Sequence, residues 1–178
     1  LAVGTQSNGP GHETAFPQYA ADILDLCPGE ISYVQADTDR VARGAGHGGA
    51  RSLHQGGEAI RLAAAALLGT ARTAAARLLQ CDPGTLHYAR GRFGLPDGRG
   101  LDLAAIAAEE GGLEGEGTHG NDRVTHPNGA HAAEVERDPE TGEWRLLSDL
   151  CVDDYGTLLN PLLTIGSVQG GLAQGIVQ

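Results

Sequence analysis

The spacing of apolar residues predicts two amphipathic helices in the first half of the chain. Over 15–26 the apolar positions recur every three or four residues, and Pro17 falls in the expected first turn, where its missing N–H costs little. The Ala- and Leu-rich stretch 58–80 keeps the same spacing and predicts a long helix, which Gly69 would bend or split.

Alternation of apolar and polar residues predicts the strands. Short strands are expected at 1–5 and 31–36, a hairpin closed by a Pro-Asp-Gly turn at 85–98, and two longer strands around Asp-Pro-Glu-Thr-Gly within 130–154. The inward positions of the longer pair would be Ala133, Val135, Trp144 and Leu146. A short helix over 103–110, capped by Asp102, and a helix from Leu162 onward complete the set. This mixed order indicates an α/β or α+β fold.

Glycine-rich polar loops precede several of these helices. Glycine accounts for 28 of the 178 residues, roughly twice its average share of about 7%. Such loops lead toward apparent helices at 9–14, 44–57 and 166–175. The first N–H groups of a helix lack partners and attract anions, and glycine lets a ligand approach the backbone closely. Together the three loops predict a shared cradle for a large anionic ligand, such as a dinucleotide-like cofactor.

Composition excludes several other classes of protein. The chain carries 12 basic and 23 acidic side chains, for a net charge of −11, and it has no lysine. A nucleic-acid groove and a P-loop are therefore not expected. No apolar run approaches the roughly 18 residues of a membrane span, and no signal peptide is visible, so a cytoplasmic protein is expected.

Cysteine, histidine and aspartate show no spacing typical of metal ligands. Cys27, Cys81 and Cys151 lie far apart and are predicted to be buried small hydrophobes in a reducing cytoplasm. The histidines, including His47 and His131, are expected to be solvated or hydrogen-bonded without a metal. The Asp37/Asp39 and Asp153/Asp154 pairs are explained by turn chemistry, so no catalytic role is assigned to them.

Three blocks of sequence resemble one enzyme family. The segment 4–14, Gly-Thr-Gln-Ser followed by Gly-Pro-Gly-His-Glu-Thr, resembles a loop and helix of the molybdopterin-binding large subunits of the xanthine dehydrogenase and aldehyde oxidase family. Its closest likeness is to aerobic carbon monoxide dehydrogenase large subunits. The segments 37–59 and 126–176 resemble later blocks of the same subunits in the same order, and only about 58–125 is loosely matched. Pro10 and Ser167 stand where that family commonly has Gln.

The resemblance implies a molybdenum hydroxylase, an oxidoreductase that uses water as its oxygen source. It implies a molybdenum–molybdopterin cofactor, often in the cytosine dinucleotide form, with Fe–S clusters and FAD on partner subunits or domains. An Fe–S small subunit and an FAD medium subunit in a dimer of heterotrimers, acting on a small-molecule substrate, are the expected partners. By position, the cofactor-binding residues would be Gly9, Gly11, His12, Gly48, Gly49, Ala50, Arg51, Ser52 and Ser167, with a third cradle over 166–174.

The resemblance also sets expectations for the extent of the chain. Both ends look truncated, and 1–178 is expected to be a piece of the cofactor-binding domain with a possible loop or linker at 111–125. No catalytic residue is assigned, because the family's catalytic glutamate is expected beyond Gln178. Two alternatives stay open at this point: a non-enzymatic module that binds another phosphate-bearing ligand, and an inactive scaffold that folds only against partners.

Overall fold

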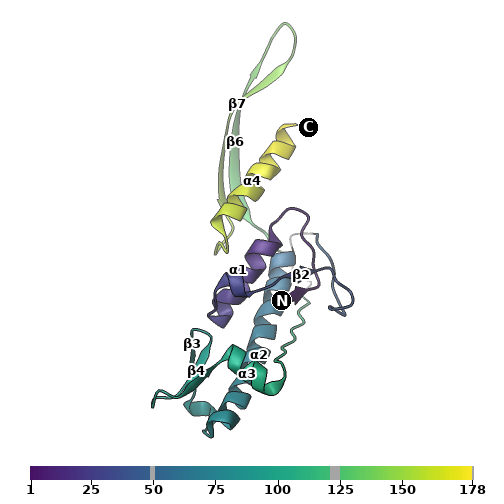
Figure 1. Cartoon of the computed structure of the whole chain (residues 1–178). Coiled ribbons are helices and arrows are strands. Elements are labelled where there is room, and N and C mark those ends of the chain that lie inside the picture. Colours follow the sequence, from purple (N-terminus) through teal and green to yellow (C-terminus); the bar gives the residue numbers. More distant parts are fainter. Residues whose placement is uncertain (49–50, 121–124, 178) are drawn as a thin grey trace. The chain divides into compact units, whose positions relative to one another are not determined.

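The computed structural model describes residues 1–48, 51–120 and 125–177, and the chain divides into two compact units, Leu1–Val124 and Thr125–Gln178 (Figure 1). Helices and small sheets are mixed along the chain, which confirms the predicted fold class. Each unit is described by itself below.

The first unit opens with a strand–helix–strand arrangement. Strand β1 (Ala2–Val3) pairs in parallel with β2 (Val34–Gln35), and helix α1 (His12–Leu24) lies between them in sequence. A one-turn 3-10 helix, Pro28–Glu30, follows α1. Both strands are shorter than predicted. Their pairing brings the start of the first glycine-rich loop beside the segment that leads into the second.

Helix α1 begins three residues before its predicted start. Gly11 adopts a left-handed conformation (φ 75°) immediately before the helix, a geometry that glycine accepts without steric cost. The prediction that Pro17 occupies the first turn is therefore wrong, because this proline lies inside the helix and is buried. Apolar periodicity located the helix, but it did not include the polar first turn.

Helix α2 (Gly57–Leu79) forms the centre of the first unit, where it contacts α1 and α3 (Figure 1). It is one continuous helix, so the expected bend or split at Gly69 is wrong. A π-helical turn, Ser52–Gly56, leads directly into it. One apolar cluster joins α2 to α1 and β1 around Phe16, and a second joins α2 to the small sheet and α3 around Phe93.

Helical residues Ser52–Leu79 also meet the length and composition of a membrane span. Among the described residues this is the one helical stretch that does so, with 28 residues and a mean hydropathy of 1.3. The stretch is not one continuous apolar run, because charged residues such as Glu58, Arg61 and Arg72 interrupt it. A core helix of a folded domain passes the same test, and the buried face of α2 supplies residues to both apolar clusters, including Ile60 and Ala71.

A three-stranded antiparallel sheet replaces the predicted hairpin at 85–98. After a 3-10 turn (Pro83–Thr85), strands β3 (His87–Ala89), β4 (Arg92–Gly94) and β5 (Gly100–Asp102) pair in sequence order. The Pro-Asp-Gly turn joins β4 to β5, while Arg90 and Gly91 join β3 to β4. The third strand was missed because its three residues are too few to show alternation.

Helix α3 (Leu103–Glu110) is confirmed, but its expected cap is not formed. Asp102 is at the N-cap position, yet its side chain makes no capping hydrogen bond. Its carboxylate instead accepts a hydrogen bond from the guanidinium of Arg92 at 3.2 Å.

Residues 111–120 form neither helix nor strand and run against α2. A Cβ at Gly115 would lie 2.3 Å from the Ala63 carbonyl oxygen, and one at Gly117 would lie 2.1 Å from that of Ala59. These glycines therefore serve close backbone packing on the helix.

The second unit contains a long hairpin and a helix. Strands β6 (Asn128–Arg137) and β7 (Trp144–Asp154) are antiparallel, with a register shift between Glu134 and Val135. Helix α4 (Pro161–Ile176) follows, and the Asn160 side chain caps it by accepting from the Leu163 N–H at 3.1 Å. The hairpin around Asp-Pro-Glu-Thr-Gly is confirmed.

Two expectations about burial are wrong. Of the inward candidates on the hairpin, Ala133, Val135, Trp144 and Leu146 are all exposed. No residue in the described part of this unit reaches the buried class, so no core forms here for them to enter. The three cysteines are not buried either: Cys27 is exposed, and Cys81 and Cys151 are half-buried.

Candidate functional site

The segment that leads into the first glycine-rich loop crosses the second loop, with backbone contact at Gly4 and Gly44; these two stretches are called the crossed loops below. A Cβ at Gly4 would lie 2.4 Å from the Arg43 carbonyl oxygen, and one at Gly44 would lie 2.1 Å from the Gly4 carbonyl oxygen. Just beyond the crossing, the Gly46 N–H donates to the Gly4 carbonyl at 3.4 Å. Only glycine permits this approach, and it brings segments 40 residues apart in sequence to one place.

A chain of hydroxyl and imidazole hydrogen bonds links the crossed loops. The Thr5 hydroxyl donates to the Gly46 carbonyl at 3.0 Å and lies 2.7 Å from the Ser52 hydroxyl. Ser52 in turn lies 2.8 Å from Nδ1 of His47. Ser52 is held in the π-helical turn that starts α2, so this chain ties the second loop to the helix and to the first loop.

His12, the first residue of α1, lies beside this chain of hydrogen bonds. Together with Thr5, His47 and Ser52 it forms a polar cluster. Its imidazole stacks on Phe16, with ring centroids 4.7 Å apart, and meets His47 edge-on at 5.5 Å. Burial, reinforced by the nearby His47, lowers the pKa of His12, so the neutral imidazole is favoured. Its Nδ1 is buried and has no hydrogen-bond partner within the part of the chain that the structure describes.

Within the described residues, the buried polar side chains all lie in this polar cluster. The buried polar residues are Thr5, His12 and Ser52, at 5–6% exposure, and all three belong to the cluster. Buried polar groups normally serve a hydrogen-bonding purpose, since leaving one unpaired costs about 1–3 kcal/mol. The unpaired nitrogen of His12 therefore marks a position where a polar ligand atom would be stabilised.

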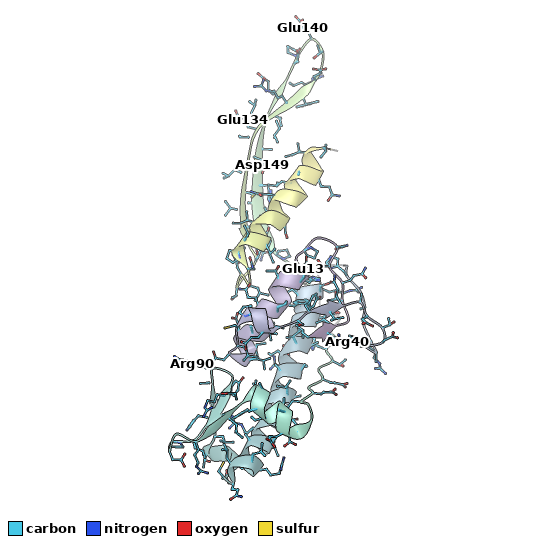
Figure 2. All side chains as sticks on the ribbon, viewed as in Figure 1. Glu13, Arg40, Arg90, Glu134, Glu140 and Asp149 are labelled. Atoms are coloured by element: carbon cyan, nitrogen blue, oxygen red, sulfur yellow. The ribbon has the colours of Figure 1, made fainter. Side chains whose placement is uncertain are left out.

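The space beside the cluster is open around its glycines. A Cβ at Gly9, Gly46 or Gly48 would meet nothing within 4 Å in the described residues, and each of these glycines has a positive φ. Gly11 supplies no side-chain cap to α1, which leaves that end of the helix to its backbone N–H groups. Glu13, labelled in Figure 2, follows in the first turn.

Gln35, at the end of β2, fixes the first loop from the other side. Its side-chain oxygen accepts from the Ser7 N–H at 2.6 Å and lies 3.5 Å from the Tyr33 hydroxyl. Burial, followed by the charge of Glu13, raises the pKa of Tyr33 to about 12.

The structure brings most of the predicted site residues of the first unit together. Gly9, Gly11, His12, Gly48, Arg51 and Ser52 all belong to the crossed loops or the helix starts beside them, and Arg51 donates to the Ala45 carbonyl at 3.1 Å. The predicted positions Gly49 and Ala50 lie outside the described residues.

The expected third loop at the start of a helix is wrong. Residues 166–174 lie inside α4, which begins earlier, at Pro161, because Asn160 is its cap. Ser167 belongs to this helix, and its hydroxyl donates to the Leu163 carbonyl at 2.9 Å. Its predicted contact with a cofactor stays a prediction.

Thr5, His47 and Gln35 are the site residues that sequence reasoning missed. Thr5 lies in the quoted Gly-Thr-Gln-Ser block, so its position was visible but its role was not. His47 was expected to be solvated or hydrogen-bonded, and its contact with Ser52 is such a hydrogen bond, but its place in the site was not predicted. No sequence pattern marked Gln35, because its hydrogen bond to the Ser7 N–H depends on the pairing of β1 with β2.

Two crossed glycine-rich loops, a buried polar cluster and a helix start are features suited to a cofactor-binding domain. The whole chain, residues 1–178, matches the molybdopterin cofactor-binding domain family, and it belongs to that family. It is 32% identical to the gamma subunit of the 6-hydroxypseudooxynicotine dehydrogenase complex of Paenarthrobacter nicotinovorans, over 99% of this chain and 24% of that one. It is also 32% identical to the carbon monoxide dehydrogenase large chain of Hydrogenophaga pseudoflava, over 97% and 23%.

Solved structures agree with this assignment. The fold matches a crystal structure of the Cu,Mo-CO dehydrogenase with a TM-score of 0.84 and 30% identity, covering 96% of this chain and 23% of that one. Quinoline 2-oxidoreductase from Pseudomonas putida 86 matches with a TM-score of 0.82 and 28% identity, over 98% and 24%. The chain thus spans about a quarter of the length of these relatives.

Proposed function

We propose that this chain holds the anionic, phosphate-bearing part of a molybdenum–molybdopterin cofactor in the crossed loops of its first unit. The observation that carries the proposal is the confinement of buried polar side chains to Thr5, His12 and Ser52, beside open glycines and the start of α1. Backbone N–H groups at glycines and helix starts are suited to phosphate. Membership of the molybdopterin family supports this ligand over another nucleotide.

The residues present fit such a group. Gly9, Gly11 and Gly48 offer backbone without side chains, and Gly49 and Ala50 are proposed to continue this backbone cradle. Arg51 supplies positive charge, and the buried Nδ1 of His12 is a polar atom that needs a partner. The hydroxyls of Thr5 and Ser52 hydrogen-bond across the two crossed loops and hold them together. Ser167, on α4, is proposed as a further contact.

We infer that the complete protein is an oxidoreductase of the xanthine dehydrogenase and carbon monoxide dehydrogenase type. The bound cofactor would supply the molybdenum centre at which water-derived oxygen is added to a small substrate. Within this chain the proposed role is binding and orientation, so no residue of 1–178 is assigned to catalysis. We assign the whole of 1–178 to one cofactor-binding domain, with 111–125 as a connecting segment.

The same proposal includes four more specific properties of the complete protein. We propose the cytosine dinucleotide form of the cofactor, Fe–S clusters and FAD on partner subunits, a dimer of heterotrimers and a cytoplasmic location. Relatives named as a gamma subunit and as large chains support multi-subunit assembly. The strongly acidic composition, at −11, gives no support to a nucleic-acid partner.

The test is the cofactor content of the full-length protein with a side chain added to the open loop. We expect Gly9→Ala to lower the molybdenum and cytidine monophosphate recovered per protein chain several-fold, because a methyl group would enter the proposed cradle at a φ of 124°. Gly98→Ala is the matched control: this glycine also has a positive φ (89°) and open surroundings, but it lies in the turn between β4 and β5.

Three outcomes separate the possibilities. Loss of molybdenum in Gly9→Ala but not in Gly98→Ala supports the proposal. Equal molybdenum in both variants and the wild type would remove the first loop from the binding site. Release of a plain nucleotide without pterin from the wild-type protein would favour a non-molybdenum phosphate-binding module.

A further inference from the structure

Three potential metal ligands from two strands converge on one face of the second unit's hairpin. His131 of β6 is directly opposite Cys151 of β7, and Asp153, two residues further along β7, points to the same face. One ligand atom from each lies within 4.8 Å of the other two. Sequence spacing gave no hint of this group, because the strand register alone brings residues 20 positions apart together.

The carboxylate of Asp153 is held in place from two sides. A Cβ at Gly129, its cross-strand neighbour, would lie 1.9 Å from Oδ1, so the carboxylate occupies space that any other residue would fill. Oδ1 lies 3.2 Å from Nε2 of His131, and the Tyr155 hydroxyl donates to Oδ2 at 2.9 Å.

The donor set matches a borderline divalent cation. Imidazole nitrogen, thiolate sulfur and carboxylate oxygen are the three ligand types that zinc takes in proteins. With zinc–ligand bonds of about 2.0–2.1 Å, nitrogen and oxygen ligands in a tetrahedron are about 3.3 Å apart, close to the 3.2 Å that separates Nε2 and Oδ1. A hydroxyl on the second carboxylate oxygen is typical of the outer ligands that orient metal-bound groups.

A simpler account is a His–Asp hydrogen bond with a cysteine nearby. That account explains the 3.2 Å separation between Nε2 and Oδ1 equally well. It gives no role, however, to the thiol of Cys151 or to Gly129, which leaves room for the Asp153 carboxylate. A three-ligand metal site uses all three side chains, together with the space that Gly129 leaves for the Asp153 carboxylate.

We propose that His131, Cys151 and Asp153 bind one Zn²⁺ ion, with its fourth position open to water or to a ligand from elsewhere in the complete protein. Binding releases the thiol proton of Cys151 to solvent, because zinc takes this ligand as a thiolate. The ion would join β6 to β7 close to the loop that leads into α4. The proposal uses only residues of the second unit and does not rest on the proposed cofactor function.

The first experiment measures zinc in the full-length protein by equilibrium dialysis and elemental analysis. We expect about one high-affinity Zn²⁺ per chain, lost in Cys151→Ala and His131→Ala. The matched controls are Cys27→Ala, an exposed cysteine remote in sequence, and His126→Ala, an exposed histidine of the same unit outside the group. Tyr155→Phe removes the orienting hydroxyl and should weaken binding by about tenfold.

A second experiment needs no variant and guards against misfolding. Alkylation of the wild-type protein, followed by peptide mass spectrometry, should show Cys151 protected by Zn²⁺ but not by Mg²⁺, with Cys27 unaffected. Wild-type protein that retains no zinc, or zinc retained equally by Cys151→Ala, would overturn the proposal. Alkylation of Cys151 that is unchanged by saturating Zn²⁺ would overturn it as well.

Discussion

Replacing Gly44 by alanine should force the two crossed loops apart. The new Cβ would be 2.1 Å from the Gly4 carbonyl oxygen and 2.7 Å from the Gly4 Cα. Ordinary contact begins at about 3.4 Å, so the backbones must separate by about 1.3 Å, the difference between 3.4 and 2.1 Å. Both partners are main chain, so no side chain can rotate away to relieve the contact.

The separation costs packing energy and at least one hydrogen bond. Overpacking in a tight site costs about 1–3 kcal/mol. A shift of that size also breaks the bond from the Gly46 N–H to the Gly4 carbonyl, which is already 3.4 Å long, and a typical hydrogen bond contributes about 1 kcal/mol. The local opening free energy of the loops should therefore fall by about 2–4 kcal/mol. At 1.4 kcal/mol per tenfold change, the loop amides should exchange at least about 30 times faster.

Hydrogen exchange with mass spectrometry of the full-length protein measures this effect directly on peptides covering 1–14 and 43–57. Gly69→Ala is the matched control with the opposite sign. A Cβ there meets nothing within 4 Å in the middle of α2, so alanine should stabilise the helix by about 0.5–1 kcal/mol. Exchange of both loop peptides within about threefold of the wild type in Gly44→Ala would refute the crossing of the loops.

Three further predictions concern single groups. Ser52→Ala should destabilise the loop cluster by about 1–3 kcal/mol, since it leaves the buried Thr5 hydroxyl and His47 Nδ1 without the group that joins them; loop hydrogen exchange measures this. Because burial lowers the pKa of His12 in the folded state, its contribution to the stability of cofactor-free protein should be complete above about pH 6.5 and lost as the pH falls through the lowered pKa. Unfolding melts from pH 7.5 to 5 should show that dependence, and His12→Asn should flatten it. Asn160→Ala should raise amide exchange in the first turn of α4, since this cap contributes about 1 kcal/mol.

The sequence predicted the elements of the first unit better than their connections. Periodicity located α1 and α2 because each buries a continuous apolar face. It could not place the first turn of α1 or the three-residue strand β5, which have too few apolar positions. The glycine-rich loops were identified, but their crossing at Gly4 and Gly44 depends on parallel pairing of two-residue strands, which leaves no pattern in the sequence.

In the second unit the same reasoning failed on burial. Alternation of apolar and polar residues on β6 and β7 correctly predicts a hairpin. The prediction that one face of this hairpin is buried assumes a core, and the described residues of this unit form none. Trp144 at 69% exposure and Leu162 at 78% show that the apolar residues of the described part have no cover there. Alternation reports which residues favour burial, but not whether the covering surface belongs to the same compact unit.

Helix α4 shows why glycine must be judged by its neighbours. Gly115 and Gly117 have α2 backbone within contact distance, whereas Cβ atoms at Gly166, Gly170 and Gly171 would meet nothing within 4 Å. Glycine inside a helix costs about 0.5–1 kcal/mol relative to alanine, so these three weaken α4 by about 1.5–3 kcal/mol with no compensating contact in the described residues. The apolar side chains of the same helix, such as Leu162 and Ile165, are exposed, so within the described residues they add no packing that would offset this deficit.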